Sequence, residues 1–119
     1  METEEKVPEI AEYFYRKAIN AYLVESPEKI LEYFDRALTA YPGYAKAWNE
    51  KGNFLDYLGK YKEAIQCYDK AIKLDPALSE AYFNRGMTLN KMGKTKEAIP
   101  CINYGVKRTS MLGDKTAGA

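Results

Sequence analysis

The feature that most constrains this chain is a repeat with a period of 34 residues. When the sequence is written in rows that begin at Ala11, Ala45 and Ser79, residues of similar size fall in the same columns. One column holds the large side chains Phe14, Trp48 and Tyr82, and another holds the small residues Ala18, Gly52 and Gly86. A chain that repeats itself at this interval folds as stacked copies of one small unit.

Each row contains two helical segments. Apolar residues recur every three or four positions over about 14 residues, which is the period of an amphipathic helix. Gly59 and Gly93 lie between the two segments, where a left-handed helix cap favours glycine. In the first row Ser26 is a plausible N-cap and Pro27 a first helical residue. The sequence predicts helices over 8–24, 27–40, 45–58, 61–74, 79–92 and 95–108, and it predicts no strand.

Further columns agree along the rows: Ile30, Ala64 and Ala98; Phe34, Tyr68 and Ile102; Ala37, Ala71 and Gly105; and the row-closing Pro42 and Pro76. Over residues 11–112 this pattern resembles the tetratricopeptide repeat (TPR). The resemblance implies an all-α fold, an α-solenoid in which three TPR hairpins stack into a right-handed superhelix. The expected organisation is an N-terminal extension at 1–10, repeats at 11–44, 45–78 and 79–112, and a tail at 113–119.

The third row departs most from this pattern. Ser110 replaces the row-closing proline, and Pro100 lies inside the second helical segment. Because proline removes a backbone donor, Pro100 is expected to bend this helix or to delay its start. The tail from Gly113 is short and rich in small residues, so we expect no additional capping helix there.

Composition excludes several classes of function. The 18 basic and 17 acidic residues leave a net charge of +1, so the basic excess of a nucleic-acid-binding protein is absent. No apolar stretch approaches the roughly 20 residues that span a membrane, and the acidic N-terminus is unlike a secretory signal. With only two cysteines and no histidine, we expect a cytoplasmic protein with reduced thiols that is not an enzyme and has no metal or cofactor.

Two local patterns have a structural interpretation. Gly93, Lys94 and Thr95 suggest a phosphate-binding loop, but Thr88 stands where that loop needs another glycine, so a turn is the better prediction. Cys67 and Cys101 occupy one column on successive second helices, which are about 8–10 Å apart and too distant for an unstrained disulfide. We therefore expect both thiols to be packed or partly exposed.

The resemblance also implies a site. In tetratricopeptide arrays the first helix of each hairpin lines a concave groove that binds a segment of another protein. The matching positions here are Glu12, Tyr15, Ile19, Tyr22, Lys46, Asn49, Asn53, Tyr57, Phe83, Asn84, Met87, Asn90 and Lys91. Some relatives clamp the acidic C-termini of chaperones; Asn53 and Asn84 match part of that clamp, but Asn49 stands where it needs a lysine.

An alternative function is self-assembly. A terminal repeat without a neighbour leaves its hydrophobic face uncovered unless it is capped. The residues expected at this possible oligomer face are Leu89, Met92, Ile102, Val106, Met111 and Leu112. The sequence therefore leaves two functions open: a scaffold that binds a peptide or helix of a partner protein in its groove, and a unit that forms a homodimer, or receives a partner's helix, at its uncapped end.

Overall fold

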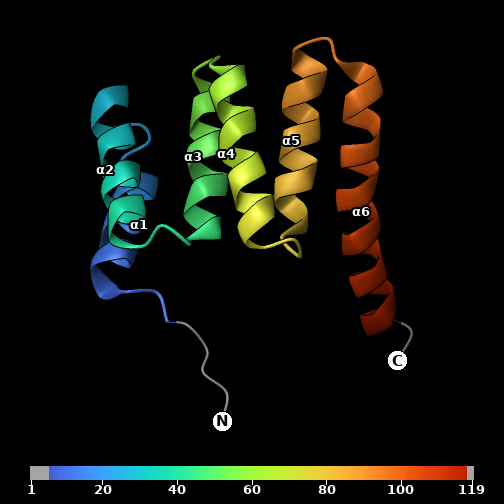
Figure 1. The fold of residues 1–119 in the computed structure, drawn as a ribbon, viewed down its shortest axis with the longest axis horizontal. Helices are drawn as coiled ribbons and strands as arrows, with labels where there is room; N and C mark the ends of the chain where they lie inside the picture. The colour runs from blue at the N-terminus through green and yellow to red at the C-terminus, as the bar shows by residue number, and fades with distance from the viewer. Residues whose placement is uncertain (1–5, 118–119) are drawn as a thin grey trace.

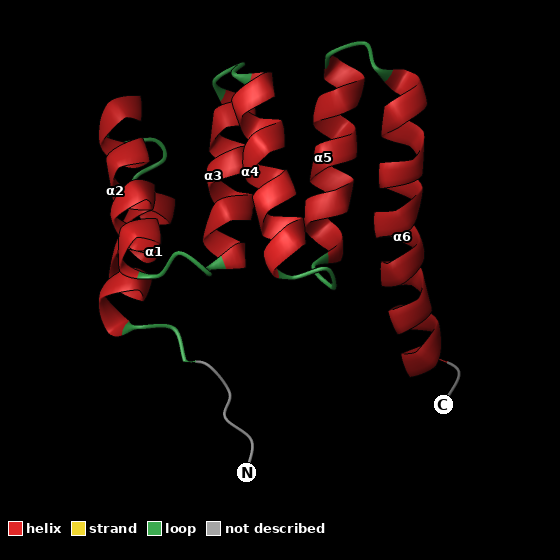
Figure 2. Ribbon diagram, viewed as in Figure 1, coloured by secondary structure: helices red, strands yellow, loops and turns green. Residues whose placement is uncertain are grey.

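The computed structural model describes the backbone of residues 6–117 and the side chains of residues 6–107. The described part of the chain forms six helices and no strand. They are α1 (Glu9–Asn20), α2 (Pro27–Ala40), α3 (Ala45–Tyr57), α4 (Tyr61–Leu74), α5 (Ser79–Lys91) and α6 (Thr95–Ala117). Successive helices pair as three hairpins that lie side by side in chain order (Figures 1 and 2). This arrangement confirms the predicted all-α solenoid of three hairpins.

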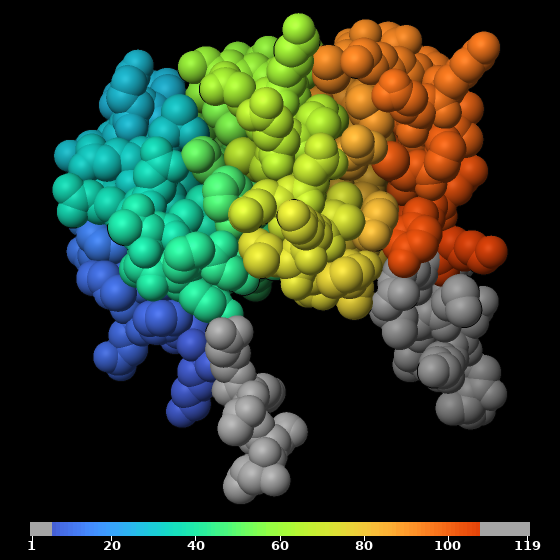
Figure 3. All heavy atoms as spheres, viewed as in Figure 1, coloured from blue at the N-terminus to red at the C-terminus, as the bar shows by residue number. Residues whose placement is uncertain are grey.

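Contacts between neighbouring hairpins are made mainly by the second helix of one hairpin and the first helix of the next. Helix α3 packs against α2, and α5 packs against both α4 and α3. In the space-filling view the three hairpins form adjoining blocks, from blue through green to orange (Figure 3). Two ion pairs with the same spacing join consecutive hairpins: Lys51 Nζ lies 2.8 Å from Asp35 Oδ1, and Arg85 Nε lies 2.6 Å from Asp69 Oδ1.

The turns inside the second and third hairpins follow from glycine. Gly59 and Gly93 both have φ of 81°, a conformation that costs other residues a steric penalty. The amide of Lys60 donates to the Leu55 carbonyl at 2.8 Å, and that of Lys94 donates to the Leu89 carbonyl at 2.9 Å. These bonds close the end of the first helix in each hairpin.

The first hairpin turns differently, and the predicted end of its first helix at residue 24 is wrong. Helix α1 ends at Asn20, and the chain turns over residues 21–25. Glu25 stands at the position of Gly59, so the glycine-type cap is missing and a wider turn replaces it. Ser26 then caps α2 as predicted, its Oγ accepting from the Lys29 amide at 3.3 Å.

The last helix is longer than predicted. Helix α6 begins at Thr95, so Pro100 does not delay its start, and it continues to Ala117 rather than ending near 108. The side chains of Lys96 and Pro100 are both exposed, so the Lys96 carbonyl that loses its helical donor lies on the solvent side. With Ser110 in place of the row-closing proline, no strong helix breaker stands at the end of the third row. Residues 113–117 therefore continue α6 and form no separate capping helix.

Close packing inside each hairpin depends on the small-residue column. A Cβ atom on Gly52 would lie 2.7 Å from Tyr68 Cε1, and one on Gly86 would lie 2.6 Å from Ile102 Cγ1. Tyr68 is the large side chain that lies against Gly52. Tyr68 is 1% exposed, whereas Trp48 is only half-buried.

Candidate protein-binding surface

Hydrogen bonds join α1, α3 and α5 at several of the residues predicted to line a groove. Asn84 Nδ2 donates to Asn49 Oδ1 at 3.1 Å, which links α5 to α3. The Tyr22 hydroxyl, just beyond α1, donates to the Glu50 carbonyl at 3.4 Å. We call this surface the first-helix face; its described members are Glu12, Tyr15, Ile19, Tyr22, Lys46, Glu50, Asn53, Tyr57, Glu80, Phe83, Asn84, Met87, Asn90 and Lys91.

Asn49 does not belong to the exposed part of this face. Its side chain is fully buried, accepts from Asn84 and donates from Nδ2 to Glu80 Oε1 at 3.4 Å. A buried amide with its bonds made inside the protein has no free group to offer a ligand. The prediction that Asn49 contacts a ligand is therefore corrected: it joins α3 to α5.

Asn53 and Lys91 are also held in place by neighbours, but each remains partly accessible. Asn53 Oδ1 accepts from the buried Tyr68 hydroxyl at 2.7 Å, which fixes the orientation of the amide. Lys91 Nζ lies 2.5 Å from Asp56 Oδ1, and the buried Thr88 hydroxyl donates to the same carboxylate. The ends of α3 and α5 are thus tied together beside the first-helix face.

Glu12 and Asn90, near the two ends of the face, bond to residues close to them in sequence. Glu12 Oε2 lies 2.8 Å from Arg16 Nη2 in an exposed ion pair along α1. The Thr95 hydroxyl, at the start of α6, donates to Asn90 Oδ1 at 3.4 Å. Glu12 is therefore already neutralised by a cation of its own helix.

Apolar side chains are exposed at the α3 and α5 parts of this face. Tyr57 is 68% exposed, Met87 40% and Phe83 38%. Tyr15 and Tyr22 are half-buried and pack against the hairpin core, where the Tyr22 ring centroid lies 5.0 Å from that of Phe54. The first-helix face therefore exposes apolar side chains that a partner can contact, and its two half-buried tyrosines are held in place by packing.

Two carboxylates outside the predicted groove set lie among these side chains. Asn53 Nδ2 donates to Glu50 Oε1 at 3.5 Å, and Asn49 Nδ2 donates to Glu80 Oε1 at 3.4 Å. Burial, followed by the charges of Glu50, the Tyr44 phenol and Glu80, raises the pKa of Tyr15. Glu50 is half-buried, and this burial raises its pKa above the usual 4.5, with Glu80 adding to the shift. Within residues 6–107 neither carboxylate belongs to an ion pair.

The helical spacing could have revealed both acids. Lys46, Glu50, Asn53 and Tyr57 follow one another at intervals of four, three and four on α3, so they share one stripe of the helix. Glu80 precedes Asn84, Met87 and Lys91 on α5 with the same spacing. Both acids were missed because carboxylates among lysines at helical spacing usually indicate a solvated surface.

The possible oligomer face is partly exposed. Leu89 is only 3% exposed, and Ile102 packs over Gly86, so neither forms an open apolar surface. Met92 is half-buried, whereas Val106 is 50% exposed and Ile99, which was not predicted, is 51% exposed. The predicted members Met111 and Leu112 lie outside the described side chains.

The side chains that could take part in catalysis or metal binding make structural contacts instead. Burial raises the pKa of the Cys67 thiol to about 11, so this thiol is protonated near neutral pH. Cys101 is half-buried beside Arg85, whose Nη1 lies 3.2 Å from the sulfur. Among the residues searched, no group of three or more acidic, cysteine or histidine side chains could hold a metal ion. The same portion of the chain contains no helix with the length and hydropathy of a membrane span.

Comparisons with known proteins agree with the architecture. Residues 45–78 and residues 67–99 each match a family model described as tetratricopeptide repeat. The protein MJ0572 of Methanocaldococcus jannaschii is 42% identical over 57 residues, which make up 48% of this chain and 66% of that protein. The chain therefore matches just under two thirds of this curated relative.

Two solved structures illustrate the similarity. A crystal structure of MamA has a TM-score of 0.81 at 22% identity, covering 87% of this chain and 61% of that one. The second TPR of Spaghetti (RPAP3), bound to the HSP90 peptide SRMEEVD, has a TM-score of 0.77 at 22% identity, covering 82% and 91%. At this identity the likeness shows the fold alone. The two matching family models and the three stacked hairpins identify the chain as a tetratricopeptide-repeat protein with several repeats.

Proposed function

We propose that this protein binds a segment of a partner protein on its first-helix face, and that the segment carries a lysine or arginine. The tetratricopeptide fold supports a protein-interaction scaffold. The observation that carries the finer proposal is the exposed apolar set Tyr57, Phe83 and Met87 beside Glu50 and Glu80, two carboxylates without an ion pair among the described side chains.

The charge preference follows from the surroundings of Glu50. Burial raises the pKa of Glu50 although the Asn53 amide donates to it and the charge of Lys46 acts in the opposite direction, so this carboxylate, which has no ion pair among the described side chains, keeps part of its desolvation cost. A cationic side chain placed between Glu50 and Glu80 would offset this cost and form charge-assisted hydrogen bonds. An acidic segment would instead add a like charge. The peptide SRMEEVD, which is bound to the similar structure of the second TPR of Spaghetti, contains more acidic than basic residues and so differs from the segment proposed here.

Selection from a random peptide library tests this proposal. We expect the retained peptides to be enriched in lysine or arginine beside an apolar residue. Exchanging both acids, Glu50→Gln with Glu80→Gln, should weaken their binding by about tenfold or more, because a hydrogen bond to a charged group contributes roughly 1.5–3 kcal/mol. The matched control is Glu63→Gln with Glu97→Gln, which changes exposed acids on α4 and α6 and should leave affinity unchanged.

The same peptides should bind less tightly in acid. Because the folded-state pKa of Glu50 lies above 4.5, the carboxylate that attracts the cation is lost as the pH falls through that raised value. Fluorescence anisotropy at a series of pH values measures this effect. Enrichment of acidic peptides, or affinity that the double exchange does not change, would rule out the charge preference. If Phe83→Ala weakened the binding of none of the selected peptides, the first-helix face would not be the binding site.

Self-assembly through the outer side of α6 is a second proposal. Ile99 and Val106 are 51% and 50% exposed, whereas Leu38, which lies two repeat periods before Val106, is 7% exposed beneath the next hairpin. A second copy would cover α6 as that hairpin covers α2. Light scattering at high micromolar concentration should then give twice 13.6 kDa, and Val106→Glu should restore the monomer. A monomer at that concentration would refute self-assembly.

A further inference from the structure

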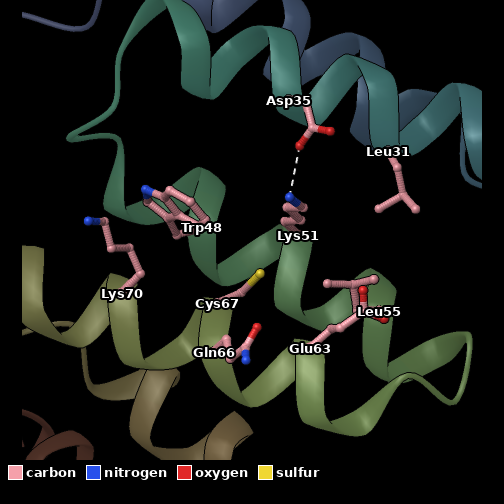
Figure 4. A pocket seen from close by; sticks show the side chains of 9 residues that line it. All are labelled: Leu31, Asp35, Trp48, Lys51, Leu55, Glu63, Gln66, Cys67 and Lys70. Carbon is pink, nitrogen blue, oxygen red and sulfur yellow. Dashed lines mark hydrogen bonds and ion pairs between the residues drawn. The ribbon is translucent and has the colours of Figure 1, made fainter.

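A cavity of about 500 Å³ lies between α2, α3 and α4, away from the exposed residues that carry the proposed function (Figure 4). Its walls include Leu31 from α2, Leu55 and Trp48 from α3, and Cys67 from α4. We propose that this cavity receives an aromatic side chain of a partner protein, which packs on the Trp48 ring.

The third hairpin shows what packs on the residue that corresponds to Trp48. Moving each residue by one repeat turns Trp48 into Tyr82 and Lys70 into Tyr104. There the Tyr104 ring packs on Tyr82 with ring centroids 4.2 Å apart. Within the third hairpin, α6 thus places an aromatic ring on Tyr82, whereas in the second hairpin the corresponding position on α4 places only the Lys70 side chain over Trp48.

The side chains around Trp48 are already arranged so that an aromatic ring can pack on the indole. The Trp48 indole is held in one orientation because its Nε1 donates to the Pro42 carbonyl at 3.0 Å. The ammonium groups of Lys51 and Lys70 lie 5.7 and 5.9 Å from the Trp48 ring centroid. Lys51 is fixed by Asp35, but Lys70 is exposed and has no ion pair within residues 6–107. An incoming ring can therefore displace Lys70 without breaking an ion pair.

The other side chains that line the cavity are also compatible with an aromatic ring. Leu31 and Leu55 are apolar, and Figure 4 shows the Cys67 sulfur between Lys51 and the α4 backbone. The protonated thiol is a polarizable neighbour that packs well against aromatic rings. The charged groups of Lys51 and Asp35 pair with each other, so they do not require a charged guest.

A cavity with an open rim is better suited to an aromatic side chain of a partner protein than to a free small molecule. Glu63, Gln66 and Lys70 line the cavity and are exposed, so one side remains open to solvent. Small-molecule sites generally bury 70–90% of their ligand. An aromatic anchor brings surrounding residues that seal the rim, as at the centres of protein interfaces.

Trp48 is the only tryptophan of the chain, so it reports directly on this cavity. We would titrate the protein with N-acetyl-tyrosinamide while following Trp48 fluorescence and the single indole N–H resonance. The expected result is a saturable change at both, with at least tenfold weaker binding of N-acetyl-leucinamide. Equal binding of leucinamide, or no saturable change, would overturn the proposal. Binding of p-cresol tighter than the tyrosinamide would also overturn it, since the site would then serve free aromatic molecules.

A designed variant supplies an independent test. Lys70→Tyr reproduces the Tyr104 arrangement, so the unliganded variant should show a ring-current shift of the Trp48 indole resonance and bind the tyrosinamide at least tenfold more weakly. Lys62→Tyr adds the same ring at an exposed α4 position that does not line the cavity, and should bind as the unmodified protein does. An unshifted indole resonance in Lys70→Tyr, or unchanged binding, would contradict the proposal.

Discussion

Replacing Tyr68 by alanine should lower the free energy of unfolding by about 3–5 kcal/mol, the range for deleting a buried aromatic side chain. Tyr68 is 1% exposed and packs against Gly52. Glycine has no side chain that could move into the space left by the removed ring, so the cavity would stay open. Urea unfolding followed by circular dichroism would measure the loss. Since a domain of this size has a total stability of about 5–15 kcal/mol, much of the array would be unfolded at moderate temperature.

Tyr68→Phe is the matched control for this experiment. It keeps the ring and removes only the hydroxyl that donates to Asn53 at 2.7 Å. A single hydrogen bond contributes about 0.5–1.5 kcal/mol net, so this variant should retain most of the stability. If both variants lost the same amount, the hydroxyl would determine stability, and the packing of the ring on Gly52 would not.

Gly86→Ala should destabilise the protein by about 1–3 kcal/mol, although alanine is the better helix former by about 1 kcal/mol. The added methyl would lie 3.0 Å from both the Ala98 carbonyl oxygen and the Ile102 amide nitrogen, and 2.6 Å from Ile102 Cγ1. Two of these neighbours are backbone atoms, so α5 and α6 would have to move apart. Thermal unfolding would measure the shift.

Gly43→Ala separates this packing effect from the general effect of removing a glycine. The three atoms nearest to its Cβ would all belong to Tyr41, the first at 3.4 Å, and Gly43 is not among the glycines with positive φ. We expect no loss, or a gain of about 0.4–1 kcal/mol from the reduced entropy of the unfolded chain. A stabilising Gly86→Ala would show that the small-residue column is not required for close packing.

The arrangement of the hairpins could be predicted because the 34-residue period determines which residues lie opposite one another. Gly59 and Gly93 marked two of the turns correctly, since a left-handed cap has a clear residue preference. The predicted ends of α1 and α6 were wrong because the sequence has no clear helix-terminating residue at either position. Glu25 does not show where α1 ends, and Ser110 does not stop α6.

The binding face was harder to predict than the fold. Helical spacing identifies the stripe on which a residue lies, but not whether a neighbouring hairpin covers it. Asn49 shares a helix with Asn53, yet only Asn49 is fully buried, because α5 supplies Asn84 and Glu80 to meet it. The role of Glu50 likewise depends on its burial and on the approach of Glu80 from the next hairpin.

The most direct test of binding on the first-helix face is to locate a bound peptide on the protein. Of the four methionines, Met87 lies on this face with 40% exposure, whereas Met92 and Met111 lie at the end of α5 and in α6. With ¹³C-labelled methionine methyl groups, titration with a library-selected lysine- or arginine-containing peptide should shift the Met87 signal most strongly. The Glu50→Gln, Glu80→Gln protein should lose that shift at the same peptide concentration. Shifts confined to Met92 or Met111, with Met87 unchanged, would place binding at the end of the array and contradict binding on the first-helix face.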